Sequence, residues 1–174
     1  MKFRSIFMGA ALLAGVMFTG CSDDDDDCIA DYTGPLTESE TPLVGKWVLS
    51  SITSTKAVDI TDDEEENPST DIYAQYTDCQ KDAGYTFNEE RDYKFEQGTT
   101  ASNCENKVIT NGTWQYTNNQ ISFVTSCTVL NLPVTFTNAN TSFQSVSQLL
   151  IRDVTGQTVE ADVTFTYTKA TAEE

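Results

Sequence analysis

The sequence contains no histidine, and basic residues are few: 10 lysines and arginines stand against 27 aspartates and glutamates. Without histidine the chain cannot form a Ser-His-Asp or Cys-His catalytic arrangement or a histidine-ligated metal site. The formal net charge of -17 repels phosphate backbones and anionic lipid headgroups, so we expect no nucleic-acid binding. Glycine-rich phosphate loops and dinucleotide fingerprints are also missing. These absences favour a protein that is not an enzyme and uses no cofactor.

Carboxylates are abundant, but their positions favour contact with solvent. Ten of them fall in two short blocks, Asp23–Asp27 and Asp62–Glu66, and blocks of like charge repel one another and stay hydrated. Neither block has the alternating oxygen ligands and internal glycine of a dedicated calcium loop. We therefore expect no catalytic residues and no metal site.

The N-terminal residues have the pattern of an export signal followed by a cysteine. Lys2 and Arg4 precede an apolar stretch, Ile6–Phe18, that is too short to span a bilayer comfortably. Small residues then lead to Cys21, and this order resembles the lipobox of bacterial lipoproteins. The resemblance implies cleavage after residue 20 and lipid attachment at Cys21, with ~0.8 kcal/mol of membrane affinity per buried methylene. A signal peptide followed by an unmodified Cys21 in a disulfide is the alternative.

Residues 21–42 are predicted to form an acidic tether between this membrane anchor and a folded domain. Asp23–Asp27 follow Cys21 almost directly, which resembles the surface-export signal of lipoproteins in some Gram-negative bacteria. That resemblance implies a protein displayed on the outer face of the outer membrane. The expected organisation is a signal peptide at 1–20, the lipidated tether at 21–42 and one domain at 43–170.

The remaining four cysteines favour two disulfides, because an even number in an oxidising compartment usually pairs. Four cysteines allow three pairings, which the sequence alone does not separate. We favour Cys79–Cys104, which closes a loop around one expected hairpin and stabilises the fold by ~3 kcal/mol on the chain-entropy argument. Cys28 with Cys127 is then the possible second pair, and it attaches the end of the tether to the domain.

From Leu43 onward, β-branched and aromatic residues recur in short runs between Gly, Asn, Asp and Pro, which is typical of strands. The clearest hairpin turns at Asn118-Asn119 and places Trp114 opposite Phe123 on one face. Asparagine tolerates the positive φ that such a tight turn requires. The local pattern and the turn chemistry therefore predict the same hairpin.

About eight strands in sequence order favour an all-β fold, an antiparallel up-and-down barrel, with a two-sheet sandwich as the alternative. Pro133 cannot donate to a ladder, so its strand is predicted to have an edge or a bulge there. A short helix is possible between 71 and 82. Apart from the central hairpin, the expected strands are residues 46–53, 84–87, 92–96, 130–136, 143–152 and 158–168.

Short motifs in this predicted barrel resemble the bacterial lipocalin-like domain family. Gly45 and Trp47 form a Gly-x-Trp at the head of the first strand, and Gly112 and Trp114 open the central hairpin. The lipocalin pattern also has an arginine late in the barrel that packs over the signature tryptophan, and Lys169 is the nearest basic residue here. The resemblance implies a secreted lipoprotein with a small lipocalin-like barrel.

Two hypotheses for the function follow, the first by analogy with this family and the second from the number of aromatic residues. The first is a lipid-anchored, non-catalytic protein whose barrel binds a small apolar or amphipathic ligand, at residues that the sequence does not identify. The second is a structural or interaction protein of the cell surface, with an unknown protein partner and a barrel filled by its own aromatic rings. An eight-stranded barrel has just enough space for either arrangement, and in the second both tryptophans are plain core residues.

Overall fold

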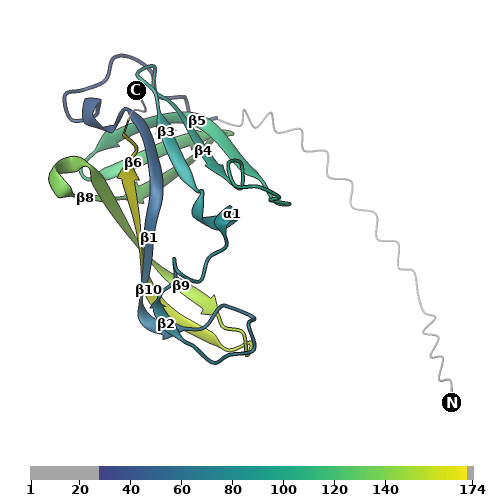
Figure 1. Cartoon of the computed structure of the whole chain (residues 1–174). Helices are drawn as coiled ribbons and strands as arrows, with labels where there is room; N and C mark the ends of the chain where they lie inside the picture. Colours follow the sequence, from purple (N-terminus) through teal and green to yellow (C-terminus); the bar gives the residue numbers. More distant parts are fainter. Residues whose placement is uncertain (1–27, 172–174) are drawn as a thin grey trace, which may run out of the picture.

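The computed structural model describes residues 28–171, and Figure 1 shows them as a curled sheet with very little helix. The expected signal peptide (1–20), Cys21 and Asp23–Asp27 lie outside the described residues. Three one-turn helices are η1 (Thr41–Leu43), α1 (Asp78–Lys81) and η2 (Asn138–Asn140). The strands are β1 (Gly45–Val58), β2 (Ser69–Asp71), β3 (Gly84–Phe87), β4 (Asp92–Gln97), β5 (Val108–Thr117), β6 (Gln120–Thr125), β7 (Thr128–Pro133), β8 (Thr135–Thr137), β9 (Ser142–Arg152) and β10 (Thr158–Lys169).

The strands form one antiparallel sheet that curls into a nearly closed barrel. Their order is β7-β6-β5-β4-β3-β1-β10-β9-β8, with β2 beside β1. This is an up-and-down meander in which the first long strand pairs with the last. β7 and β8, the two ends of the order, are separated in the chain only by Val134 and form the two halves of one bent strand. The predicted all-β barrel is therefore confirmed, and the sandwich alternative is wrong.

The bent strand has a different partner on each side of Pro133. β7 pairs with β6 as far as Pro133, which lies opposite Gln120, whereas β8 pairs with β9 from Thr135, which lies opposite Gln144. Proline has no N–H to donate, so a ladder weakens where it occurs. Within the described residues, no ladder joins β7 to β9 beyond this bend. We call the place where β7 and β9 separate without pairing the fork in the barrel wall. The edge or bulge predicted at Pro133 is confirmed in this form.

The central hairpin has the predicted turn and register. Asn118 and Asn119 have φ of 52° and 59°, the left-handed backbone that a two-residue hairpin turn needs. Trp114 lies opposite Phe123, and both are buried. The β3–β4 hairpin and β10 also agree with the sequence pattern, and α1 occupies part of the stretch in which a short helix was possible.

Large aromatic rings fill the part of the barrel next to η1. The Trp47 and Phe143 ring centroids lie 5.1 Å apart, and those of Phe87 and Trp114 lie 4.9 Å apart. Tilted ring pairs of this kind contribute ~0.5–1.5 kcal/mol beyond the burial of their area. Most of the interior is therefore solid core, with the largest fully buried rings supplied by Trp47, Trp114, Phe87, Phe123 and Phe143.

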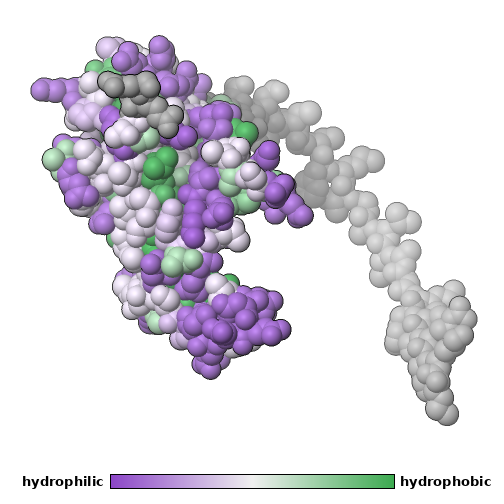
Figure 2. Space-filling model, viewed as in Figure 1, coloured by the Kyte–Doolittle hydropathy of each residue, from purple (hydrophilic) through white to green (hydrophobic). Residues whose placement is uncertain are grey.

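β1, β9 and β10 continue past the barrel as an extension, which forms the lower part of Figure 1 together with β2. These three strands have 14, 11 and 12 residues, whereas β3 has 4 and β6 has 6. The extension ends at the acidic block Asp62–Glu66 and at the turn that joins β9 to β10. Figure 2 shows that this end of the molecule is strongly hydrophilic. The acidic block is therefore hydrated, as its charge predicts.

Candidate functional site

Residues 28–43, which we call the strap, pack on the barrel ahead of the first strand. The Tyr32 N–H donates to the Thr113 hydroxyl on β5 at 2.9 Å, and Leu43 is fully buried in the core. Cys28, the first described residue, is bonded to Cys127 in the turn between β6 and β7. The predicted tether, residues 21–42, therefore ends in a segment that is fixed to the barrel.

A buried ion pair holds the strap in place. The Arg91 guanidinium donates to both carboxylate oxygens of Glu40, at 2.7 and 2.8 Å, and also to the carbonyl oxygens of Gly34 and Pro35. The Glu40 carboxylate accepts a further hydrogen bond from the Tyr116 N–H at 3.0 Å. Glu40 and Arg91 are 0% and 4% exposed, so both charges are desolvated but fully hydrogen-bonded. Removing one partner of such a pair strongly destabilises the folded protein, because the other charge stays buried without compensation.

The pKa of Glu40 shows which effect dominates at this ion pair. Burial by itself raises the pKa of this carboxyl group, but hydrogen bonds from Arg91, Thr37 and Tyr116 outweigh it and lower the pKa from 4.5 to about 2. Glu40 is therefore an anion at neutral pH. Sequence reasoning missed the pair because its partners lie 51 residues apart and belong to no motif.

Lys169 occupies the place that the lipocalin pattern gives to an arginine. Its ammonium lies 5.6 Å from the centre of the Trp47 ring and donates to the Pro42 carbonyl oxygen at 2.7 Å. Gly45 makes room for it, because a Cβ at this residue would lie 3.3 Å from the lysine side chain, and its φ of 119° is one that other residues rarely adopt. Gly45, Trp47 and Lys169 together build the end of the barrel covered by η1.

Gly112 has a packing role in the barrel wall. A Cβ there would collide with the Val124 carbonyl oxygen and lie 2.9 Å from the Tyr93 ring. Trp114 is fully buried, and its indole N–H donates to the Asn88 carbonyl oxygen at 3.2 Å. The four motif residues Gly45, Trp47, Gly112 and Trp114 are thus structural, and none of them lines the cavity described below.

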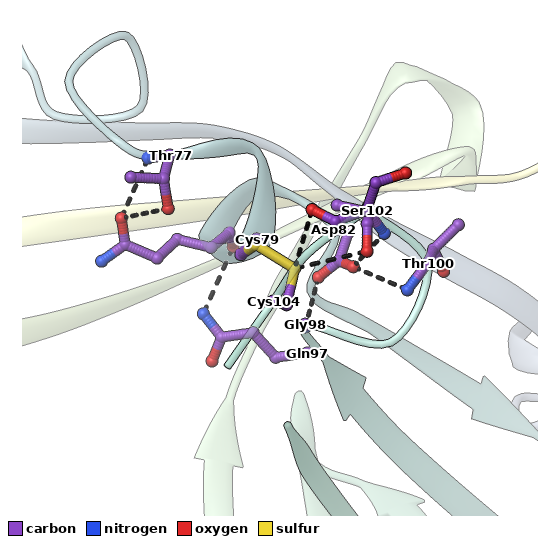
Figure 3. The surroundings of a disulfide bond; sticks show 10 residues. Thr77, Cys79, Asp82, Gln97, Gly98, Thr100, Ser102 and Cys104 are labelled. Atoms are coloured by element: carbon purple, nitrogen blue, oxygen red, sulfur yellow. Dashed lines mark hydrogen bonds between the residues drawn. A yellow bond between two sulfur atoms is a disulfide. The ribbon is translucent and has the colours of Figure 1, made fainter. Parts of the chain in front are cut away.

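Two disulfides join the pairs that the sequence favoured. Cys28–Cys127 closes the larger loop, with a sequence separation of 99, and Cys79–Cys104 the smaller, with a separation of 25. Figure 3 shows the second pair, which ties α1 to the loop between β4 and β5. The Asp82 carboxylate fastens the same loop by accepting backbone hydrogen bonds from Gly98, Thr100 and Ala101. Both disulfides fix loops and segments at the end of the barrel opposite η1.

An open cavity of about 180 Å³ lies on the inner side of the fork between β7 and β9. Leu132 comes from β7 and two serines from β9, so residues on both sides of the fork reach it. The rings of Tyr85 and Tyr167, whose centroids are 5.1 Å apart in an edge-to-face arrangement, separate it from the filled core. The complete lining is Tyr85, Leu132, Ser145, Ser147, Phe165 and Tyr167.

Ser145 belongs to the cavity lining, but its hydroxyl oxygen has almost no accessible surface. Ser145 lies opposite Phe165 and Ser147 opposite Val163 in the β9–β10 ladder, so both serines belong to the inner face. Ser145 is 3% exposed, and among residues 28–171 its Oγ is the one buried side-chain polar atom without a hydrogen-bond partner. A buried hydroxyl left unsatisfied costs about 1–3 kcal/mol.

The two tyrosines at the cavity are neutral hydrogen-bonding groups. Burial raises the pKa of Tyr85 to about 12, with a smaller contribution from Tyr93. Burial raises the pKa of Tyr167 still further, aided by Tyr85. Each phenol therefore stays protonated under physiological conditions and can donate or accept a hydrogen bond.

A larger hollow of about 390 Å³ lies at the tip of the extension, between the acidic block and the β9–β10 turn. Asp59 is the most buried carboxylate at this hollow. Its two oxygens accept hydrogen bonds from the backbone N–H groups of Thr61 and Asn67, so both oxygens are satisfied. Within residues 28–171, no group of three or more His, Cys, Asp or Glu residues is placed to hold a metal ion. The inner cavity is the better candidate for a small apolar ligand because it lies on the core-facing side of the sheet and aromatic and apolar residues form most of its lining.

The part of the chain from residue 28 to 171 contains no helix with the length and apolar character needed to cross a bilayer.

Residues 143–152 are predicted from the sequence as a strand with mixed facing, and the sequence pattern does not by itself identify the cavity. The signal was present in the alternation, since Phe143, Ser145, Ser147 and Leu149 recur at every second position. Two serines in a row of core-facing residues mark a place where the inner face turns polar. The register with β10 was needed to show that this row is the inner one.

Within residues 28–171, the fold and the site define a small, disulfide-bonded β-barrel with a strapped end and a small open cavity on its inner face. The chain matches the family described as Domain of unknown function (DUF5004) over residues 21–170, and it belongs to that family. No curated protein matches the sequence.

Proposed function

We propose that this chain is a lipid-anchored, non-catalytic lipocalin-like protein of the cell envelope that binds a small apolar or amphipathic ligand inside its barrel. The observation that carries the proposal is the open cavity of about 180 Å³ on the inner face of the sheet, lined mainly by aromatic and apolar side chains, in a barrel that is otherwise filled. Concave sites that are mostly apolar, with a few polar groups that converge on them, are typical of small-molecule binding. The lipocalin resemblance of the Gly45-x-Trp47 motif supports the same function by analogy.

The sequence supports attachment to the outer membrane through a lipid at Cys21, with display at the cell surface. Seven residue steps separate Cys21 from Cys28, which corresponds to at most about 25 Å of extended chain. Because Cys28 is bonded to Cys127 at the end of the barrel opposite η1, the membrane would lie on that side of the domain. Mass spectrometry of the mature N-terminus tests the anchor: we expect acylated Cys21, and an unmodified thiol there would rule the anchor out.

Ligand binding is tested by filling the cavity. The oxidised chain carrying Cys21→Ser, which avoids lipid attachment, is screened by thermal unfolding against small neutral, anionic and cationic apolar compounds. We expect at least one compound to raise the Tm and the variant Ser147→Phe to abolish the shift, because its ring occupies the cavity. The matched control Gln148→Phe alters the exposed outer face of β9 and keeps the shift. If no compound raises the Tm of the parent chain, the binding function is wrong.

A surface protein with a structural or protein-binding role is the second candidate. The observation in its favour is that aromatic rings fill most of the barrel, while Val146 and Leu150 on β9 are 57% and 72% exposed. Exposed apolar residues that are grouped together mark interaction sites more often than single ones do. This candidate predicts no response to small molecules in the same screen.

A further inference from the structure

One long stretch of the chain, residues 108–151, contains no aspartate, glutamate, lysine or arginine, although the formal net charge of the whole chain is -17. This stretch supplies β5 to β8 and all of β9 except Arg152. It also contains every exposed large hydrophobic residue of the described chain except Ile29 and Val154. The barrel therefore has an uncharged wall, on which even a strongly acidic partner would meet no like charge.

Within this wall, β9 has an open edge along its second half. β10 pairs with β9 over all of Ser142–Arg152, whereas β8 pairs with it only as far as Gln144. No other strand of the described residues neighbours β9 in the sheet. Beyond the fork, the side of β9 that faces away from β10 is thus the edge of the sheet. Natural edge strands are usually protected by charged residues or proline, but Ser147–Ile151 has neither.

The backbone groups at this edge belong to the even-numbered residues of β9. At one end of the β9–β10 ladder, the Lys169 N–H donates to the Thr141 carbonyl oxygen. At the other end, the Asp153 N–H donates to the Gln157 carbonyl oxygen. The register between these ends is continuous, so the odd-numbered residues of β9 exchange hydrogen bonds with β10. The even-numbered residues from 148 to 152 therefore direct their N–H and C=O groups toward the open side.

A second copy of β9 fits this edge in an antiparallel ladder centred on Leu150. Two-fold symmetry places Leu150 opposite Leu150 of the second copy, where the two residues exchange both of their backbone hydrogen bonds. Leu150 is 72% exposed, more than any other large hydrophobic residue in the described chain. On the other face, Leu149 then lies opposite Ile151 of the second copy. The same register brings Val146 toward Val154 of the second copy, so each exposed apolar residue of β9 meets an apolar partner.

The antiparallel arrangement also keeps the acidic blocks apart. In each copy Asp62–Glu66 lie at the tip of the extension, next to the β9–β10 turn. Because the paired strands run in opposite directions, each tip lies beside the fork of the other copy, where β7 and this part of β9 carry no charge. Arg152, the one charged residue among 147–152, lies opposite Gln148 of the second copy. Gln148 neighbours Asp162 on β10, so an arginine of one copy approaches a carboxylate of the other.

We propose that two copies of this chain form a dimer by pairing the open edges of β9 in an antiparallel ladder centred on Leu150. The sheet of one copy continues into the sheet of the other through their extensions, whose strands β9 and β10 lie side by side in Figure 1. In this kind of strand addition, main-chain hydrogen bonds supply affinity and the facing side chains supply specificity. The dimer does not depend on ligand binding, because residues 148–152 do not line the inner cavity.

Analytical ultracentrifugation of the oxidised Cys21→Ser chain tests the dimer, at concentrations up to about 1 mM so that weak association is included. We expect the mass to rise from one chain to two and no further, because a two-fold contact is closed. Gln148→Pro should give a monomer that keeps the Tm of the parent monomer, because the lost N–H faces the open edge and not β10. Leu150→Lys should weaken association at least about tenfold, because the two ammonium groups face each other.

Ile109→Lys is the matched control for Leu150→Lys. Ile109 is 53% exposed and belongs to the same uncharged wall, but it lies on β5, which does not neighbour β9 in the sheet. This variant should dimerise as the parent does. The proposal is wrong if the parent stays a monomer at about 1 mM or if Leu150→Lys dimerises as tightly as the parent. It is also wrong if Ile109→Lys weakens the dimer as much as Leu150→Lys.

A single added cysteine tests the register of the ladder. Leu150→Cys should form a disulfide-linked dimer, because the Cα atoms of a facing hydrogen-bonded pair lie about 5.5 Å apart, within the reach of a disulfide. Gln148→Cys should not, because its two copies are four residues apart along the ladder, which is about 13 Å. A ladder centred on Gln148 would reverse these two results and would overturn the proposed pairing.

Discussion

Acid is expected to loosen the strap by protonating a single carboxylate. Glu40 joins the strap to Arg91, and its pKa is lowered from 4.5 to about 2 in the folded protein. The folded state therefore binds this proton less tightly than the unfolded state does. The stability that the ion pair contributes is fully present above about pH 4.5 and is lost as the pH falls through about 2.

The size of the effect follows from the pKa difference. A fall from 4.5 to about 2 corresponds to about 3–4 kcal/mol in full, at about 1.4 kcal/mol per pH unit. Both side chains are buried, so solvent screening does not reduce this value greatly. It is a large share of the about 5–15 kcal/mol that stabilises a typical domain.

Urea unfolding at about pH 6 and about pH 2.5 measures the effect. Three proteins are compared: the parent chain, Glu40→Gln and Glu38→Gln, which alters an exposed acidic residue of the same strap. Between the two pH values, the parent and Glu38→Gln should lose about 2–3 kcal/mol more free energy of unfolding than Glu40→Gln does, because pH 2.5 is still above the folded-state pKa of about 2. The reasoning is refuted if Glu40→Gln keeps the full pH dependence of the parent.

Two further predictions concern covalent and steric features of the barrel. Replacing both cysteines of the Cys28–Cys127 pair by serine should lower the free energy of unfolding in urea by about 4–5 kcal/mol. The same replacement at Cys79–Cys104 should lower it by about 3 kcal/mol, because this disulfide closes a shorter loop. Equal losses would show that chain entropy does not govern the two disulfides. Gly112→Ala should lower stability by about 1–3 kcal/mol in the same assay, because its Cβ meets a backbone oxygen of β6; an unchanged midpoint would contradict this packing.

Features that depend on neighbouring residues could be predicted from the sequence. The turn at Asn118-Asn119 follows from the positive φ that asparagine tolerates. The alternation of β10 and the interruption at Pro133 follow from the two-residue period of a strand and from the missing N–H of proline. Each of these signals lies within a few positions, and together they were sufficient to predict a meander that closes as a barrel.

The cavity and the strap were decided only by the tertiary structure. Glu40 and Arg91 are separated by 51 residues, and their pairing depends on how the strap crosses the barrel. Ser145 reads as an ordinary strand serine until the register with β10 places it on the inner face. The sequence determined the strands, their turns and their order around the barrel, whereas burial and hydrogen-bond satisfaction arise between distant strands. The site therefore depends on contacts that no local pattern encodes.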